Sequence, residues 1–251
     1  MVLVVVISAA LAWVAKEARK ARQQRRTAEA IERSGGLVLY EAGQIGAAEA
    51  LAKLGKDAQP AVPALVTAIQ AGPIEVRLAA ARAVEAVGPA GEDAIPALVT
   101  LLADDRFWAR EQAARSLAAI GDAAQPALVM ALTNAPRGSA RAAAAYGLGL
   151  GRSTDDAVFK ALSAAIRDPE PRARATAAAA LVRFGPPAVQ ALVGAADDPE
   201  ASVIVAMAES LRTIHAQPQR CVPALARAMR HPQGSAIVAY ALQAFGTDAQ
   251  I

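Results

Sequence analysis

The residues best suited to catalysis or metal binding are few: one cysteine, Cys221, and two histidines, His215 and His231. Zinc sites need a cluster of cysteine and histidine ligands, and this set is too small and too scattered to form one. No Ser/His/Asp or Cys/His arrangement can be proposed from the spacing. Cys221 lies among the apolar residues of a helical pattern, which favours core packing over a catalytic thiol. We therefore predict no enzyme activity, no catalytic residues, no metal site and no cofactor.

A glycine-rich run, Tyr146–Gly151, is superficially like a phosphate-binding loop. Such loops follow a strand and open a helix, so that the helix N-terminus faces the phosphate. Here the glycines stand at the end of a helical pattern instead. Close helix packing is therefore the favoured interpretation.

Three arginines follow an apolar residue near the start of a helical segment: Arg77, Arg110 and Arg174. They could form a ladder that binds anions. The favoured alternative is structural, with each guanidinium bonded to aspartates and loop carbonyls of neighbouring segments.

Phe107-Trp108 follows Asp104, Asp105 and Arg106 and is the best candidate for an interface, because Trp and Arg are enriched at binding hot spots. In the alternative interpretation, Trp108 fills a gap between structural repeats. With Arg227, an exposed position on a later helix, these two residues are the predicted protein-binding residues.

The elements that carry these residues belong to one repeated pattern, best seen over Val76–Leu102: an Ala-rich helix, a glycine, an acidic turn and a second helix. The first helices end at a residue that recurs every 30 to 34 residues, a spacing typical of a solenoid. The first helices are predicted over 45–54, 76–87, 109–120, 139–150, 172–184, 202–214 and 235–245. The residues at their ends are Gly55, Gly88, Gly121, Gly151, Gly185, His215 and Gly246.

Several of the second helices carry a Pro-Ala-Leu signature. Proline, which lacks a backbone N–H, suits a first helical turn because the N–H groups there have no intrahelical acceptor. They are predicted to begin near Pro60, Ile95, Pro126, Val158, Ala188 and Cys221. Preceding acidic residues are placed for N-capping or for pairing with the helix dipole: Asp57, Asp93, Asp122 and Asp155.

This pattern, met best by Val76–Asp104 and Ala109–Leu132, resembles HEAT repeats, in particular the short bacterial HEAT-like class also called phycobilisome-lyase-like. The resemblance covers residues 44–246. It implies an all-α, armadillo-like fold: a right-handed α-solenoid of about six to seven HEAT-like helix pairs, preceded by an N-terminal apolar helix. The class serves unrelated roles, so activity does not follow from the fold. Neither histidine precedes a glutamate, so the His-Glu pairs of HEAT-like di-iron hydroxylases are absent.

The N-terminal run Val2–Ala15 has no charged residue, and Trp13, Lys16 and Arg19 follow the arrangement of a membrane anchor. A signal peptide and a buried helix are the alternatives. We expect residues 1–15 to be a single-pass anchor, 16–43 a basic juxtamembrane helix and linker, and 44–251 the repeat solenoid, in the cytoplasm. The residues expected to face anionic headgroups are Lys16, Arg19, Lys20, Arg22, Arg25 and Arg26.

The anchor, the basic helix and the break at Gly35-Gly36 together resemble the N-terminal region of planctomycete repeat proteins, a resemblance that carries no known activity. Residues 37–40 could form a brief extended segment.

Charge is unevenly distributed along the chain. The first 36 residues carry seven basic and three acidic residues, which leaves 19 basic and 20 acidic in the rest. A nearly neutral array argues against nucleic acid as its ligand.

The leading hypothesis is a membrane-tethered, non-catalytic scaffold or adaptor that binds a protein or peptide, with its second helices forming the binding face. The alternative is an accessory subunit or lyase of the bilin type. The last pair lacks a second helix, so we expect either further sequence or a partner at that end.

Overall fold

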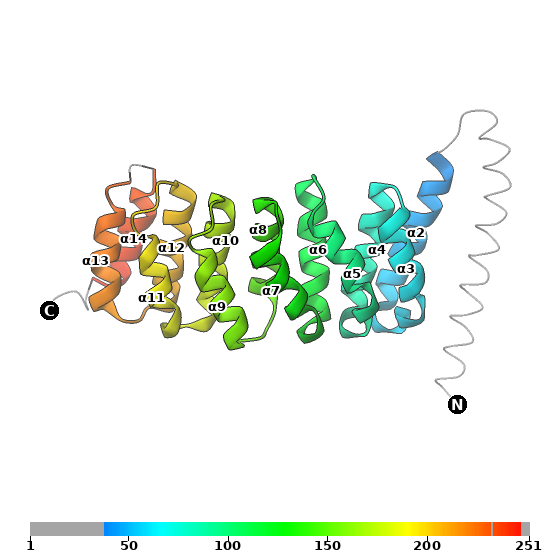
Figure 1. The fold of residues 1–251 in the computed structure, drawn as a ribbon, viewed down its shortest axis with the longest axis horizontal. Helices are drawn as coiled ribbons and strands as arrows, with labels where there is room; N and C mark the ends of the chain where they lie inside the picture. Colours follow the sequence, from blue (N-terminus) through cyan, green and yellow to red (C-terminus); the bar gives the residue numbers. More distant parts are fainter. Residues whose placement is uncertain (1–37, 232, 247–251) are drawn as a thin grey trace. The chain divides into compact units, whose positions relative to one another are not determined.

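The computed structural model describes residues 38–231 and 233–246 (Figure 1). Every regular element within these ranges is helical, which confirms the predicted all-α, HEAT-like solenoid. The chain divides into two compact units, with the boundary between Val87 and Gly88. The predicted anchor, the residues expected to face the membrane, and the Gly35-Gly36 break all lie outside the described residues. The domain boundaries drawn from the sequence stay predictions.

In the first unit, α4 (Ile74–Val87) contacts both α2 (Val38–Leu54) and α3 (Val62–Ala71). A 3₁₀ segment, η1 (Gly55–Ala61), joins α2 to α3. Apolar side chains such as Leu65, Ile69 and Val84 are buried there. The suggested extended segment over 37–40 is wrong for the residues described, because α2 already begins at Val38.

In the second unit, helices α6, α8, α10, α12 and α14 form a row in which each contacts the next, and α5, α7, α9, α11 and α13 pack against it (Figure 1). The row comprises α6 (Phe107–Ile120), α8 (Gly138–Leu150), α10 (Pro171–Leu181), α12 (Ala201–Ile214) and α14 (Ser235–Ala244). The packing helices are α5 (Ile95–Leu102), α7 (Gln125–Asn134), α9 (Asp156–Ala165), α11 (Val189–Leu192) and α13 (Pro218–Ala228). The predicted first and second helices are thus found in their expected places.

The recurring glycines end the first helices because most of them take a backbone conformation with positive φ, which glycine adopts without steric cost. Gly55, Gly88, Gly121 and Gly185 have φ of 57°, 69°, 86° and 62°. His215 occupies the same place in its repeat with φ 46°, an uncommon value for a residue with a side chain.

The predicted side-chain capping of the second helices is wrong. No side-chain hydrogen bond caps α3, α5, α7 or α9. At α3, α5 and α7 the chain enters through a 3₁₀ turn that places the aspartate before the N-cap residue. Asp122 instead accepts a hydrogen bond from the side chain of Gln125.

The localisation predicted from the sequence, a single-pass membrane protein with cytoplasmic repeats, is contradicted. Within residues 38–231 and 233–246, no helix combines the length and the apolar character that crossing a bilayer requires. The longest described helix, α2, has 17 residues and carries Glu41, Glu49 and Lys53. At about 1.5 Å per residue it spans roughly 26 Å, short of a hydrocarbon core of about 30 Å.

Candidate functional site

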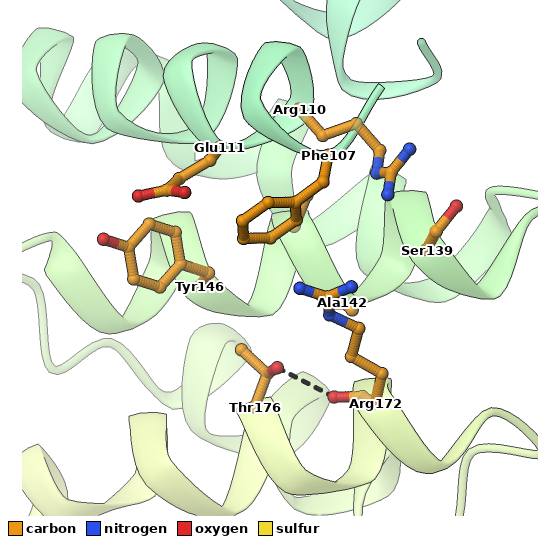
Figure 2. Close-up of a pocket in the computed structure, with 9 residues that line it drawn as sticks. Phe107, Arg110, Glu111, Ser139, Ala142, Tyr146, Arg172 and Thr176 are labelled. Carbon is orange, nitrogen blue, oxygen red and sulfur yellow. Dashed lines mark hydrogen bonds between the residues drawn. The ribbon is translucent and has the colours of Figure 1, made fainter. Parts of the chain in front are cut away.

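A cavity of about 210 Å³ lies on the row of first helices, between α6, α8 and α10 (Figure 2). Its position differs from the prediction, which placed the binding face on the second helices. The residues that line it are Phe107, Arg110, Glu111, Ser139, Ala142, Ala143, Tyr146, Arg172 and Thr176.

Phe107 and Arg172 form the centre of this cavity, although 65 positions separate them in the sequence. The guanidinium carbon of Arg172 lies 4.3 Å from the centroid of the Phe107 ring, a cation–π contact. Phe107 is nevertheless 50% exposed. The ring therefore offers an accessible apolar surface with a positive charge beside it.

Arg110 is held at the wall of the cavity by its own preceding loop. Its Nη1 donates to the carbonyl oxygens of Asp104 and Asp105, both at 2.7 Å. The residue is only 8% exposed. These two bonds fix the position of the guanidinium. Because Nη1 makes both of them, Nε and Nη2 remain able to donate hydrogen bonds to another acceptor.

On the other side of Phe107, Glu111 and Tyr146 face each other (Figure 2). Arg115 donates to the Glu111 carboxylate. Hydrogen bonds with Tyr146 and with Glu111, in that order of effect, raise the pKa of Arg115. The charge of Glu111 is therefore matched by Arg115. Arg110 and Arg172 have no ion pair with any described carboxylate, so the cavity is left with an excess of positive charge.

The structural interpretation is confirmed for Arg77 and Arg174, whereas Arg110 bonds to loop carbonyls but to no described aspartate carboxylate. Arg174 donates from Nε and Nη2 to the Asp198 carboxylate, at 2.7 and 2.9 Å, and from Nη1 to loop carbonyls. Arg77 donates from Nε to the carbonyl of Ile69 at 3.0 Å. Sequence reasoning missed Arg141, which donates from Nε and Nη2 to the Asp168 carboxylate as Arg174 does to Asp198. The signal was present, since Ala140-Arg141 repeats the apolar-Arg pattern of Val76-Arg77.

The glycine-rich run packs helices, as favoured from the sequence. A Cβ on Gly147 would lie 3.0 Å from Leu128 Cδ2 and 3.1 Å from the Ala114 carbonyl oxygen. A Cβ on Gly149 would lie 3.0 Å from the Cβ of Ala180. Helix α8 can approach its neighbours this closely only where it lacks side chains.

The three predicted protein-binding residues are not brought together. Phe107 and Trp108 open α6, and Trp108 is 45% exposed, which favours a surface role over filling a gap between repeats. Arg227 lies on α13, where it forms an ion pair with Asp197 at 3.1 Å. It does not line the cavity between α6, α8 and α10. The binding role of all three residues stays a prediction.

Cys221 is a buried core residue. Burial raises the pKa of its thiol to about 11, and the sulfur lies 3.1 Å from the Ala216 carbonyl oxygen, to which it donates. A thiol of this kind is a poor nucleophile at neutral pH, since the thiolate is the reactive form. No group of three or more histidine, cysteine, aspartate or glutamate side chains that could hold a metal ion is found among the residues described.

The solved structures to which the chain is similar include an engineered protein and a complex of phycocyanin lyase. The engineered protein is 23% identical, with a TM-score of 0.41 over 80% of this chain and 92% of that chain. The complex of CpcE and CpcF of phycocyanin lyase from Nostoc sp. PCC7120 is 25% identical, with a TM-score of 0.36 over 74% of this chain and 98% of that chain. TM-scores this low carry no argument about function. No curated protein matches the chain.

The family model of HEAT repeats matches residues 62–149 and 126–212, which together make up more than half of the chain. These matches include the whole of α6, α8 and α10, the helices that line the cavity. The chain therefore belongs to the HEAT-repeat family.

Proposed function

We propose that this protein is a non-catalytic scaffold or adaptor, a right-handed solenoid that binds a partner protein through the first-helix side of its second unit. The binding surface consists of the cavity between α6, α8 and α10 together with exposed Phe107 and Trp108. HEAT repeats are suited to this role because their rigid helix rows present an extended surface.

One observation carries the proposal: the Phe107 ring, about half exposed, lines a basic cavity, and the next residue in the chain, Trp108, is also about half exposed. Aromatic residues and arginine supply most of the binding energy at protein interfaces. Burying an aromatic ring that is now partly in water is also favourable, by roughly 25 cal/mol for each Å² of apolar surface.

The alternative, a bilin-type lyase subunit, gains no support from this cavity. At about 210 Å³ it is smaller than the roughly 300–1,000 Å³ pockets that hold small-molecule ligands. It is better matched to one or two side chains of a protein partner.

The test is partner retention by the purified protein, compared by quantitative mass spectrometry among matched variants. Phe107→Ala with Trp108→Ala should lose the partners that the wild type retains. The control is Met130→Ala, because Met130 is 65% exposed but lies on α7. Arg227→Ala tests the separate prediction for α13. Equal retention by the wild type and the Phe107/Trp108 variant would contradict the proposed surface.

A further inference from the structure

Two arginines of the first helices, Arg141 and Arg174, share one bonding pattern, and Arg110 follows only half of it. In Arg141 and Arg174, Nη1 donates to two carbonyls five and six residues earlier, and the Nε–Nη2 edge grips an aspartate of the following loop. Arg110 makes the same two carbonyl bonds from Nη1. For its other edge, the described part of the chain offers no aspartate.

The missing partner can be located in the sequence. The two aspartates held in this way, Asp168 and Asp198, each lie in the loop before a first helix. Each stands six residues before the fourth residue of that helix. The equivalent position after α7 is Ala135. The backbone there is unchanged in its role, because the Ala135 carbonyl accepts from Arg141 at 2.8 Å as the Asp168 carbonyl accepts from Arg174 at 2.9 Å. Ala135 therefore differs from Asp168 and Asp198 only in having no side-chain carboxylate.

From this vacant carboxylate position we infer, building on the proposed function, that the cavity binds the side-chain carboxylate of an aspartate in the partner protein. The carboxylate takes the place that Asp168 takes at Arg141. It bridges the Nε–Nη2 edge of Arg110, and Arg172 supplies a second positive charge from its position over Phe107. The backbone of the partner segment then lies across the exposed Phe107 ring.

The chemistry favours a carboxylate over other ligands. Arginine presents a planar fork that matches the two oxygens of a carboxylate, and such bidentate pairs are among the strongest hydrogen bonds in proteins. The two intact pairs nearby show that this geometry fits the local backbone, with nitrogen–oxygen distances of 2.6 to 2.9 Å. Glu111 does not compete, since Arg115 already matches its charge.

The test uses four acetylated pentapeptides, three of them with a C-terminal amide, and the arginine Nε–Hε signals of the whole protein in NMR spectra. The first is acetyl-Gly-Ser-Asp-Ser-Gly-amide and the second replaces its Asp with Asn. The third is the Asn peptide with a free C-terminal carboxylate, and the fourth is the Asn peptide with phosphoserine. We expect the Asp peptide to shift the Arg110 signal saturably. The Asn peptide should bind at least about tenfold more weakly.

Variants localise the binding. Arg110→Gln removes the Arg110 signal itself, so its binding is followed through the Arg172 Nε–Hε signal, which the Asp peptide should no longer shift. Arg172→Gln should weaken binding several-fold. Arg212→Gln is the matched control, because Arg212 also lies over an exposed ring, that of Tyr240 at 5.2 Å, but outside the cavity. Ala135→Asp leaves Arg110 in place and supplies the missing carboxylate from within the chain, so this variant should fold and no longer bind the Asp peptide. Ala135→Asn should still bind it.

Several results would overturn the inference: equal binding of the Asp and Asn peptides, no binding of either, tighter binding of the phosphoserine or free C-terminal peptide, or unchanged binding by Ala135→Asp. These results leave the scaffold proposal standing if the wild type retains partners that the Phe107/Trp108 variant loses. The inference and the scaffold proposal are both contradicted only if the Phe107/Trp108 variant also retains the same partners as the wild type.

Discussion

At the scale of single residues, the most informative feature is the pair formed by Arg141 and Asp168. Both side chains are largely removed from water, at 14% and 8% exposure, and two hydrogen bonds of 2.6 and 2.7 Å join them. Burial by itself raises the pKa of Asp168, but hydrogen bonds from Arg141 and the Glu170 backbone, with the charges of Arg141 and Arg174, outweigh it and lower the pKa.

This lowered pKa makes the stability contribution of Asp168 depend on pH. The folded state favours the ionised carboxylate, so the contribution is complete above the unfolded pKa of about 3.9 and is lost as the pH falls through the lower folded pKa. Asp168→Asn removes hydrogen bonds to a charged group and should lower the free energy of unfolding by about 2–3 kcal/mol at pH 7. Urea unfolding at pH 7 and at pH 3 should show this difference shrinking at the lower pH. A difference that stays constant between the two would mean that the charge is not what the pair contributes.

Cys221 gives a second residue-scale prediction. Because its thiol is buried and its pKa is raised to about 11, it should not react with a thiol reagent such as dithionitrobenzoate in the native protein at pH 8. One thiol per chain should react once the protein is unfolded in guanidinium. Rapid labelling of the native protein would contradict the burial of this side chain.

At the scale of elements, the turns after the first helices depend on glycine conformation. Gly121 has φ 86° and ψ −136°, a region that is essentially restricted to glycine. Gly121→Ala should destabilise the protein by about 1–3 kcal/mol, measured by urea unfolding. Gly194→Ala is the control, since its added Cβ would meet nothing within 4 Å and its φ is not positive. If the two variants are equally stable, the positive φ at Gly121 is not what this turn requires.

The loop before α8 should accept the aspartate that it lacks. At the equivalent positions, Asp168 and Asp198 also accept a hydrogen bond from the backbone N–H two residues later, at 2.8 and 2.9 Å. Ala135→Asp gains both this bond and the Arg110 pair, so the free energy of unfolding should rise by about 1–2 kcal/mol. Ala135→Asn, which can make the backbone bond without the ion pair, should gain less. A loss of stability in Ala135→Asp would show that Arg110 is not positioned as Arg141 is.

The helices themselves could be predicted from the sequence, because glycine at the helix end and proline in the first turn act locally and recur in most repeats. The role of the aspartates before the second helices could not be predicted. A 3₁₀ turn such as η2 (Gly88–Ala94) places Asp93 ahead of the N-cap residue. The cavity was missed for another reason. Phe107 drew attention by its residue type, but its partner Arg172 belongs to α10 and becomes its neighbour only through stacking of the repeats. Which helix face stays open likewise depends on that stacking.

At the scale of the whole molecule, a repeat protein lacks the single core of a globular domain. The arginine pairs connect residues only 24 and 27 positions apart, so each strengthens the junction of one repeat with the next. In such arrays stability is approximately a sum of repeat and nearest-neighbour terms, and damage should remain close to the altered junction.

Hydrogen exchange of Asp168→Asn tests this locality directly. Amides of α8, α9 and α10 should exchange faster than in the wild type, by the roughly 30- to 150-fold that a loss of about 2–3 kcal/mol produces. Amides of α3 and α4, in the first unit, should keep their wild-type rates. Asp93→Asn removes the same charge from an exposed aspartate with no ion pair found within the described ranges, so it serves as the charge-matched control and should leave both regions unchanged. A uniform acceleration along the chain would mean that the repeats unfold as one cooperative unit, and the surface around Phe107 would then be sensitive to changes anywhere in the array.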